Sequence, residues 1–100
     1  MTRKHKPVHP GEVLAEEFLV PLGVTPYRLA KSVGISGPRA YQLARSERSV
    51  TADTALRLAL FFGTTPEFWM NLQSHYDLEV ARDATSSGDL AKIKPFAKAG

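Results

Sequence analysis

Two polar residues three positions apart, Arg39 and Gln42, are the side chains of this sequence best suited to contact nucleic-acid bases. An arginine can donate two hydrogen bonds to guanine O6 and N7, and a glutamine can pair with adenine N6 and N7. Each such pair contributes about 1–3 kcal/mol of discrimination between bases. The residues predicted to face base edges are Gly37, Pro38, Arg39, Tyr41 and Gln42. Because the first two lack polar side chains, part of any specificity is expected to come from DNA shape.

A second set of residues suits phosphate oxygens. Ser36 and the free amides at the start of a helix can bind an anion. Arg45 and Arg48 follow the base-facing residues, whereas Arg28 and Lys31 precede them. Contacts of this kind would position the protein on a duplex without recognising its sequence. The predicted phosphate-contacting residues are Arg28, Lys31, Ser36, Arg45 and Arg48.

Two short helices joined by a tight turn would present these side chains on one surface. The sequence of residues 25–46 predicts that arrangement. Thr25 can cap a first helix that has Pro26 at its first position, where the missing N–H costs nothing. Gly34 ends it, because glycine adopts the left-handed conformation that a helix end requires. Ser36 caps the second helix. Two helices joined by a short turn that contains glycine form a helix-turn-helix. Its expected inner face is Leu29, Ala30, Val33, Ile35, Ala40, Leu43 and Ala44.

The charge distribution favours a polyanionic partner for this segment. The 100 residues have a formal net charge of +3. Residues 25–50 hold five basic residues and one acidic residue, a net charge of +4, whereas residues 64–83 have a net charge of −3. A basic patch that coincides with a helix-turn-helix is the electrostatic signature of nucleic-acid binding.

Two helices are predicted after the helix-turn-helix and one before it. The first starts at residues 9–11 and runs to about Val20, with Pro21 and Gly23 closing it and an apolar cluster of Val13, Leu14, Phe18 and Leu22. Thr51 caps the fourth helix, which Gly63 ends; its stripe is Ala55, Leu58, Ala59 and Phe62, widened by Leu56, Leu60 and Phe61. The fifth starts at Thr65 and Pro66 and ends between Val80 and Ala84, with a stripe of Phe68, Trp69, Leu72 and Tyr76. The pattern predicts an all-α bundle of five helices.

Composition indicates one small domain. Residues 1–8 are expected to form a flexible basic arm, residues 9–84 the helix-turn-helix domain, and residues 85–100 a C-terminal tail that begins with a linker at residues 86–88. The tail is either a short helix or strand used by a partner, or disordered. No apolar run approaches the roughly 20 residues of a membrane span, and the basic start lacks an apolar signal core. A cytoplasmic protein with no membrane association is expected.

Catalytic and metal chemistry find little support. The sequence contains no cysteine, which excludes disulfides and thiolate metal sites. The three histidines, His5, His9 and His75, are scattered in the sequence, so no metal site and no cofactor are predicted. Asp53 is expected to favour the start of its helix as a negative charge in the first turn. No nucleophile triad, phosphate loop or paired-carboxylate pattern is present, so the chain is not predicted to be an enzyme.

Three blocks of the sequence carry a resemblance to a known family. They are HPGEVLAEEFLVPLGVT (9–25), LAKSVGIS (29–36) and TADTALRLALFFGTTPEFWMNLQSHYDLEVA (51–81). Together they resemble the HigA-type antitoxins of bacterial toxin–antitoxin modules, in the Xre-like, lambda-repressor-like helix-turn-helix group. The resemblance implies a homodimer that binds operator DNA of its own operon, and a partner in a HigB-type toxin, a small ribosome-dependent mRNA endonuclease. The toxin is expected to be basic, which would suit Glu67, Asp77, Glu79 and Asp83.

The second helix of the helix-turn-helix, which follows Ser36 and is called the recognition helix here, departs most from the family pattern. The family commonly has an Asn-Gly-Lys-Arg-like turn after this helix, where this chain has Arg45-Ser46-Glu47-Arg48. Ser46 is therefore expected to hold a glycine-like conformation at some cost, and Glu47 places a negative charge on the predicted phosphate side. Two alternatives stay open: a toxin-neutralising protein that has lost operator binding, and a stand-alone regulator without a toxin.

Overall fold

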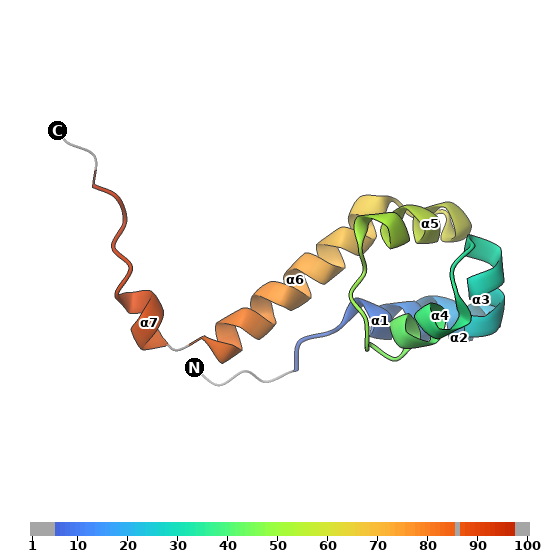
Figure 1. Ribbon diagram of the computed structural model, residues 1–100, viewed down its shortest axis with the longest axis horizontal. Coiled ribbons are helices and arrows are strands. Elements are labelled where there is room, and N and C mark those ends of the chain that lie inside the picture. The colour runs from blue at the N-terminus through green and yellow to red at the C-terminus, as the bar shows by residue number, and fades with distance from the viewer. Residues whose placement is uncertain (1–5, 86, 98–100) are drawn as a thin grey trace.

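The computed structural model describes residues 6–85 and 87–97, and every regular element within them is a helix (Figure 1). The elements in chain order are α1 (Pro10–Val13), η1 (Leu14–Leu19), α2 (Val20–Leu22), α3 (Pro26–Val33), α4 (Gly37–Ala44), α5 (Ala52–Phe62), α6 (Pro66–Ala84) and α7 (Ser87–Ala91). The first three follow one another without a break and form one helix. The all-α prediction is confirmed for the described residues, but α7 lies where a linker was predicted and adds a sixth helix to the predicted five.

The first helix contains a π-helical turn, η1. The Val20 N–H donates to the carbonyl of Ala15, five residues back. In a regular α-helix the ring of Pro21 would clash with the carbonyl four residues earlier, and the wider turn accommodates it. The helix therefore continues through Pro21 to Leu22 and ends at Gly23, whose φ is 66°. The predicted end at about Val20 was too early.

The π turn also changes which side chains face the core. Leu14 and Leu19, five positions apart, are 1% and 4% exposed, whereas Leu22 is 61% exposed. An extra residue in one turn rotates the following side chains by about 100°. The prediction that Leu22 joins the apolar cluster was wrong, because it assumed the regular helical period. Phe18 does face inward, and its ring packs against the rings of Phe62 and Trp69.

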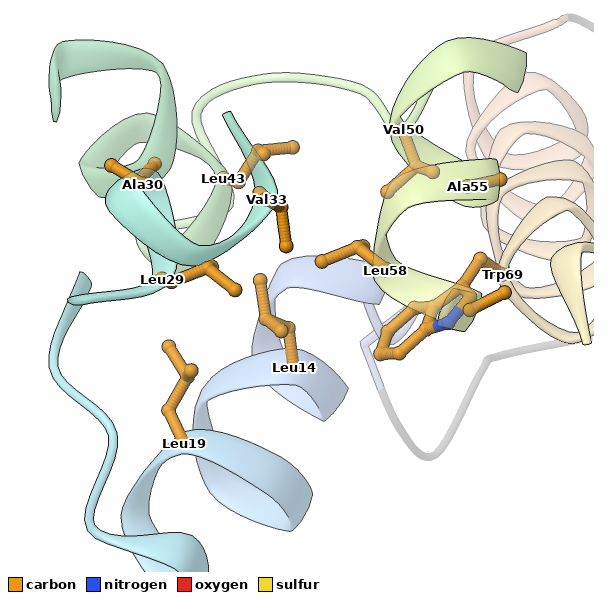
Figure 2. Close-up of a cluster of buried hydrophobic side chains, with 12 residues drawn as sticks. Leu14, Leu19, Leu29, Ala30, Val33, Leu43, Val50, Ala55, Leu58 and Trp69 are labelled. Carbon is orange, nitrogen blue, oxygen red and sulfur yellow. The ribbon is translucent and has the colours of Figure 1, made fainter. Parts of the chain in front are cut away.

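The core lies where the first helix, α3, α4 and α5 meet. Leu14, Leu29 and Leu58 point toward one another there, and Trp69 of α6 closes the side next to α5 (Figure 2). The Trp69 side chain is fully buried, and its indole N–H donates to the Thr64 hydroxyl at 2.8 Å. Full burial of a large apolar side chain stabilises the fold by about 1.5–3 kcal/mol. The recognition helix, α4, therefore packs against a closely packed hydrophobic core.

Apolar residues on α5 and α6 remain outside this core. Leu56 and Leu60, which were predicted to widen the buried face of α5, are 55% and 87% exposed. On α6, Leu78 and Val80 are also exposed. This helix ends at Ala84, within the predicted interval, and its second half extends away from the bundle (Figure 1). Much of the apolar surface of the molecule therefore lies on one projecting helix and on the outer side of α5.

The C-terminal segment combines a short helix, α7, with a stretch that has no regular structure. After α7, residues 93–97 form no regular element, and the side chains of Ile93 and Phe96 are exposed. At the other end, only residues 6–8 of the predicted arm can be described, and residues 1–5 lie outside the described part of the chain.

Candidate DNA-binding surface

The helix-turn-helix forms as its capping residues predict. The Thr25 hydroxyl accepts from the Arg28 N–H at 3.1 Å, and the Ser36 hydroxyl accepts from the Arg39 N–H at 3.2 Å. Gly34 ends α3 with a φ of 73°. Ile35 is half-buried against the core. The turn between α3 and α4 is thus fixed by local bonds at both sides and one apolar anchor.

The outer faces of α3 and α4 carry two aromatic–cation pairs. Lys31 Nζ lies 5.1 Å from the centre of the Tyr27 ring, and the Arg45 guanidinium carbon lies 5.6 Å from the centre of the Tyr41 ring. Each pair spans one turn of its helix, so the ring orients the cation on the surface. Arg28 and Pro38 are also exposed, whereas Gly37 is half-buried. The predicted residues Arg28, Lys31, Pro38, Tyr41 and Arg45 are therefore accessible on α3 and α4 and at the end of α4.

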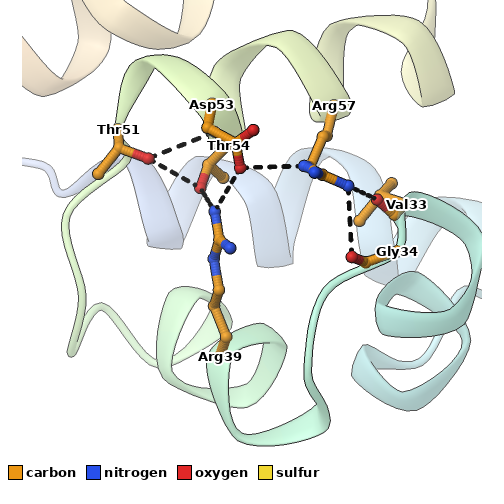
Figure 3. Close-up of polar contacts among 7 residues, drawn as sticks. All are labelled: Val33, Gly34, Arg39, Thr51, Asp53, Thr54 and Arg57. Atoms are coloured by element: carbon orange, nitrogen blue, oxygen red, sulfur yellow. Dashed lines mark hydrogen bonds and ion pairs between the residues drawn. The ribbon is translucent and has the colours of Figure 1, made fainter.

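Arg39 is directed toward α5 rather than outward. Its Nη2 lies 3.0 Å from Asp53 Oδ2 and 2.5 Å from the Thr54 hydroxyl oxygen, as Figure 3 shows. The Arg39 side chain is 26% exposed. These contacts join the first turn of α4 to the first turn of α5. The side chain predicted to contact guanine is therefore engaged within the protein in this structure.

Arg57 is a functional candidate that the sequence did not reveal. Its Nε donates to Asp53 Oδ2 at 3.0 Å, and its Nη1 donates to the carbonyl oxygens of Val33 at 2.8 Å and Gly34 at 3.3 Å (Figure 3). Hydrogen bonds from Arg57 and then Arg39 hold the pKa of the Asp53 carboxyl below its ordinary value. The four-residue spacing of Asp53 and Arg57 was a visible signal, but their link to the turn joins residues more than 20 positions apart.

The other predicted base-facing side chain also has an internal partner. Arg48 Nε donates to Gln42 Oε1 at 2.9 Å, so the loop after α4 folds back over the recognition helix. Ser46 in this loop has a φ of 63°, which confirms the expected glycine-like conformation. For a residue other than glycine this conformation costs roughly 1–2 kcal/mol.

A buried glutamine fixes the far end of the same loop. Gln73 of α6 accepts from the Val50 N–H at 2.7 Å and donates to Asp77 at 2.9 Å. Gln73 is 5% exposed, so its two bonds satisfy groups that water cannot reach. The loop that carries Arg48 is thereby tied to the middle of α6. Gln73 is a second supporting residue that the sequence pattern did not single out.

Comparison with known proteins places this surface in a family. No protein-family model matches the chain. The chain is 44% identical over 80 residues to virulence-associated protein I of Dichelobacter nodosus, which covers 80% of the chain and 74% of that protein. It is 41% identical over 75 residues to antitoxin HigA-1 of Vibrio cholerae, across 75% of the chain and 70% of the relative. The chain belongs to the HigA family of antitoxins. A solved structure of Pseudomonas aeruginosa antitoxin HigA with the higBA promoter matches it with a TM-score of 0.86 and 40% identity, over 91% of this chain and 99% of that one.

The HigA-like blocks of the sequence correspond to the supporting elements of the fold. Residues 51–81 form α5 and most of α6, and residues 9–25 form the first helix and the cap of α3. The family resemblance predicted from these blocks is confirmed. The recognition helix and the loop after it, where the sequence departs from the HigA pattern, hold the internal contacts of Arg39 and Gln42.

Other kinds of site have little support in the part of the chain that the structure describes. There, no group of three or more His, Asp or Glu side chains is arranged to hold a metal ion. No helix among these residues is long and apolar enough to cross a membrane. His5 lies outside the described residues, and His9 is buried at the start of α1.

Proposed function

We propose that the chain is a cytoplasmic, non-enzymatic antitoxin that also represses its own operon. It binds operator DNA as a homodimer and neutralises a HigB-type toxin that cleaves mRNA. The observation that carries the DNA-binding part is the helix-turn-helix, whose outer side bears the Tyr27–Lys31 and Tyr41–Arg45 pairs. The antitoxin part is supported by membership of the HigA family, and a relative of similar fold was solved with the promoter of its own module.

On this proposal the start of α4 enters the major groove. Bases are contacted by Gly37, Pro38, Arg39, Tyr41 and Gln42. Phosphates are contacted by Arg28, Lys31, Ser36, Arg45 and Arg48. Both Tyr41 and Arg45 are exposed, which suits them to contact DNA without rearrangement. Arg39 must first exchange an internal hydrogen bond for one to DNA, whereas Arg48 donates to Gln42 only through Nε and keeps its Nη hydrogens for a phosphate.

The proposed homodimer is supported by α6. Its second half extends beyond the bundle and carries exposed Leu78 and Val80. Two copies joined along the face that carries Leu78 would bury this side chain and give the protein the twofold symmetry of an inverted-repeat operator. Recognition helices in such a dimer would lie about 34 Å apart, one turn of DNA.

Gel retardation over a series of salt concentrations tests the DNA-binding part. The chain is expected to retard a duplex from the promoter of its own operon in preference to a scrambled duplex. Arg45→Ala is expected to weaken binding and to reduce the slope of log K against log salt by about 0.9, the value for one lost phosphate contact. Lys92→Ala removes the same charge from the tail and serves as the control. An Arg45→Ala variant with the affinity and slope of the wild type would place the DNA surface elsewhere.

A second candidate function is toxin neutralisation without operator binding. It is favoured by Glu47 on the phosphate side and by the internal bonds of Arg39 and Gln42. Specific retardation of the promoter duplex would eliminate it. Co-expression with the product of the neighbouring gene, followed by co-purification, separates both candidates from a stand-alone regulator. We place the toxin contact on the acidic residues of α6, namely Glu67, Asp77, Glu79 and Asp83.

A further inference from the structure

The hydrogen bonds of Arg39 occupy the one nitrogen that a bidentate guanine contact requires. A guanidinium presents two bidentate edges: one consists of Nε and Nη2, and the other of Nη1 and Nη2. Both edges include Nη2. In this structure the two hydrogens of Nη2 are directed to Asp53 and Thr54. Arg39 therefore cannot donate two bonds to guanine O6 and N7 until Asp53 or Thr54 releases one of these hydrogens.

Asp53 is held in place to receive Arg39. The same carboxylate oxygen, Oδ2, accepts from Arg57 Nε, and Arg57 is in turn bonded to the carbonyl oxygens of the turn between α3 and α4. This triad of Arg39, Asp53 and Arg57 lies at the surface, with side-chain exposures of 26%, 56% and 40%. An exposed ion pair can exchange its partner at little cost. The contact is therefore stable enough to form and weak enough to be displaced.

Holding α4 in position does not require this contact. Ala40 and Leu43 on the inner face of α4 are fully buried, and the Ser36 cap fixes its first turn. Exposed ion pairs typically add little to stability beyond such packing. The contact matters more for what Arg39 can do, because it determines whether the guanidinium faces α5 or the DNA.

We infer that Asp53, aided by Thr54, competes with operator DNA for the Arg39 guanidinium and so sets how strongly the recognition helix discriminates guanine. This inference rests on the proposed DNA-binding function. It makes Asp53 a specificity-determining residue that contacts no DNA itself. Binding of a correct site exchanges the Asp53 contact for two guanine contacts, whereas on an incorrect site Arg39 remains with Asp53.

A double-mutant cycle tests this competition. Asp53→Asn is expected to tighten binding to the promoter duplex by about two- to fivefold, the range that loss of an exposed ion pair allows. The gain is expected to disappear when Arg39→Ala is also present. The gain should also be larger on the promoter duplex than on a scrambled duplex of equal length. Thr54→Val, which removes the other acceptor, is expected to give a smaller gain with the same dependence on Arg39.

The cycle also controls for charge and for folding. Asp53→Asn makes the protein more positive, and this effect alone would persist in the Arg39→Ala background; an equal gain there overturns the inference. Unchanged or weaker binding by Asp53→Asn also overturns it, because that result would make the contact neutral or supportive. Thermal unfolding of each variant shows whether it is folded. If Asp53→Asn does not fold, Thr54→Val tests the competition for Arg39 in its place.

Failure of the proposed function gives a different result in the gel-retardation assay. It is seen when the wild-type chain does not retard the promoter duplex. Because the expected gain of Asp53→Asn is at most about fivefold, this variant is then expected not to retard the duplex either. If Asp53→Asn also fails to bind, the inference is overturned together with the function.

Discussion

At the scale of single residues, Gly11 shows how closely the first helix approaches the recognition helix. A Cβ atom at this position would overlap the carbonyl oxygen of Leu43 and lie 3.0 Å from the backbone of Ser46. Both contacts are with backbone atoms, which cannot rotate away. Glycine is therefore required here by space, and it allows α1 to support the end of α4 and the loop that carries the predicted phosphate contacts.

Gly11→Ala is expected to lower the free energy of unfolding by about 1–3 kcal/mol, the usual cost of forcing extra atoms into a packed site. Urea denaturation measures it. Gly37→Ala is the matched control, because a Cβ there meets nothing within 4 Å; it is expected to leave stability unchanged or raise it by up to about 1 kcal/mol. A Gly11→Ala variant as stable as the wild type would show that the two helices are less closely packed.

Residues whose partners are near in sequence were predictable, and those with distant partners were not. Thr25 and Ser36 bond to amides three positions away, so their roles as caps follow from local chemistry. Arg39 meets a carboxylate 14 positions away, and Gly11 faces backbone on another helix. A single sequence does not indicate such pairings, so the capping residues could be predicted, whereas the contacts of Arg39 and Gly11 could not.

At the scale of elements, the start of the first helix depends on a buried histidine. His9 Nδ1 accepts from the Gly11 N–H at 2.8 Å, and its ring packs edge-on against Tyr76 of α6. Burial lowers the pKa of His9, although the nearby charge of Asp77 opposes this shift. Protonation of Nδ1 would replace the acceptor of the cap with a donor. The cap therefore requires neutral His9.

Stability is expected to fall as the pH drops below about 6.5, the ordinary pKa of histidine. Below that value His9 binds a proton more readily in the unfolded chain than in the folded one, so the free energy of unfolding decreases. Above that value His9 is neutral in both the folded and the unfolded chain, and the full stability is present. Denaturation midpoints measured at pH values from about 7.5 to about 5, the range in which histidine changes its charge, test this expectation.

Two variants isolate the contribution of His9 from those of other titrating groups. His9→Asn keeps an acceptor at the cap but does not titrate, so it is expected to reduce the loss of stability at low pH. His75→Asn removes a histidine that takes no part in the cap, and it serves as the matched control substitution. Equal pH dependence in wild type and His9→Asn would assign the effect to groups other than His9.

The first helix also shows where helix periodicity ceases to predict structure. The existence of the helix and its start were predicted, because His9-Pro10-Gly11 precedes an amphipathic run. The π turn before Pro21 was not, since its extra residue changes the register only after Leu14. Leu19 replaced Leu22 in the core for that reason.

At the scale of the whole molecule, the exposed apolar residues Leu78 and Val80 lie on a different part of the fold from the basic faces of α3 and α4. The basic faces of α3 and α4 lie on the bundle, whereas α6 carries exposed apolar residues away from it (Figure 1). A projecting helix gains little stability from its own chain. Burial against a second copy would remove Leu78 from water, a gain of about 25 cal/mol for each Å² of apolar surface. The competing surface is the outer side of α5, where Leu56 and Leu60 are exposed.

Charged substitutions distinguish these two surfaces. Leu78→Glu is expected to convert the dimer to a monomer in sedimentation measurements and to weaken operator binding by about a hundredfold, because two linked half-sites then bind separately. Leu60→Glu changes a leucine that is 87% exposed on α5, and this variant is expected to remain a dimer with wild-type affinity. The opposite pattern would place the interface on α5. If both variants stay dimeric, neither leucine lies at the interface, and the dimer forms through other residues.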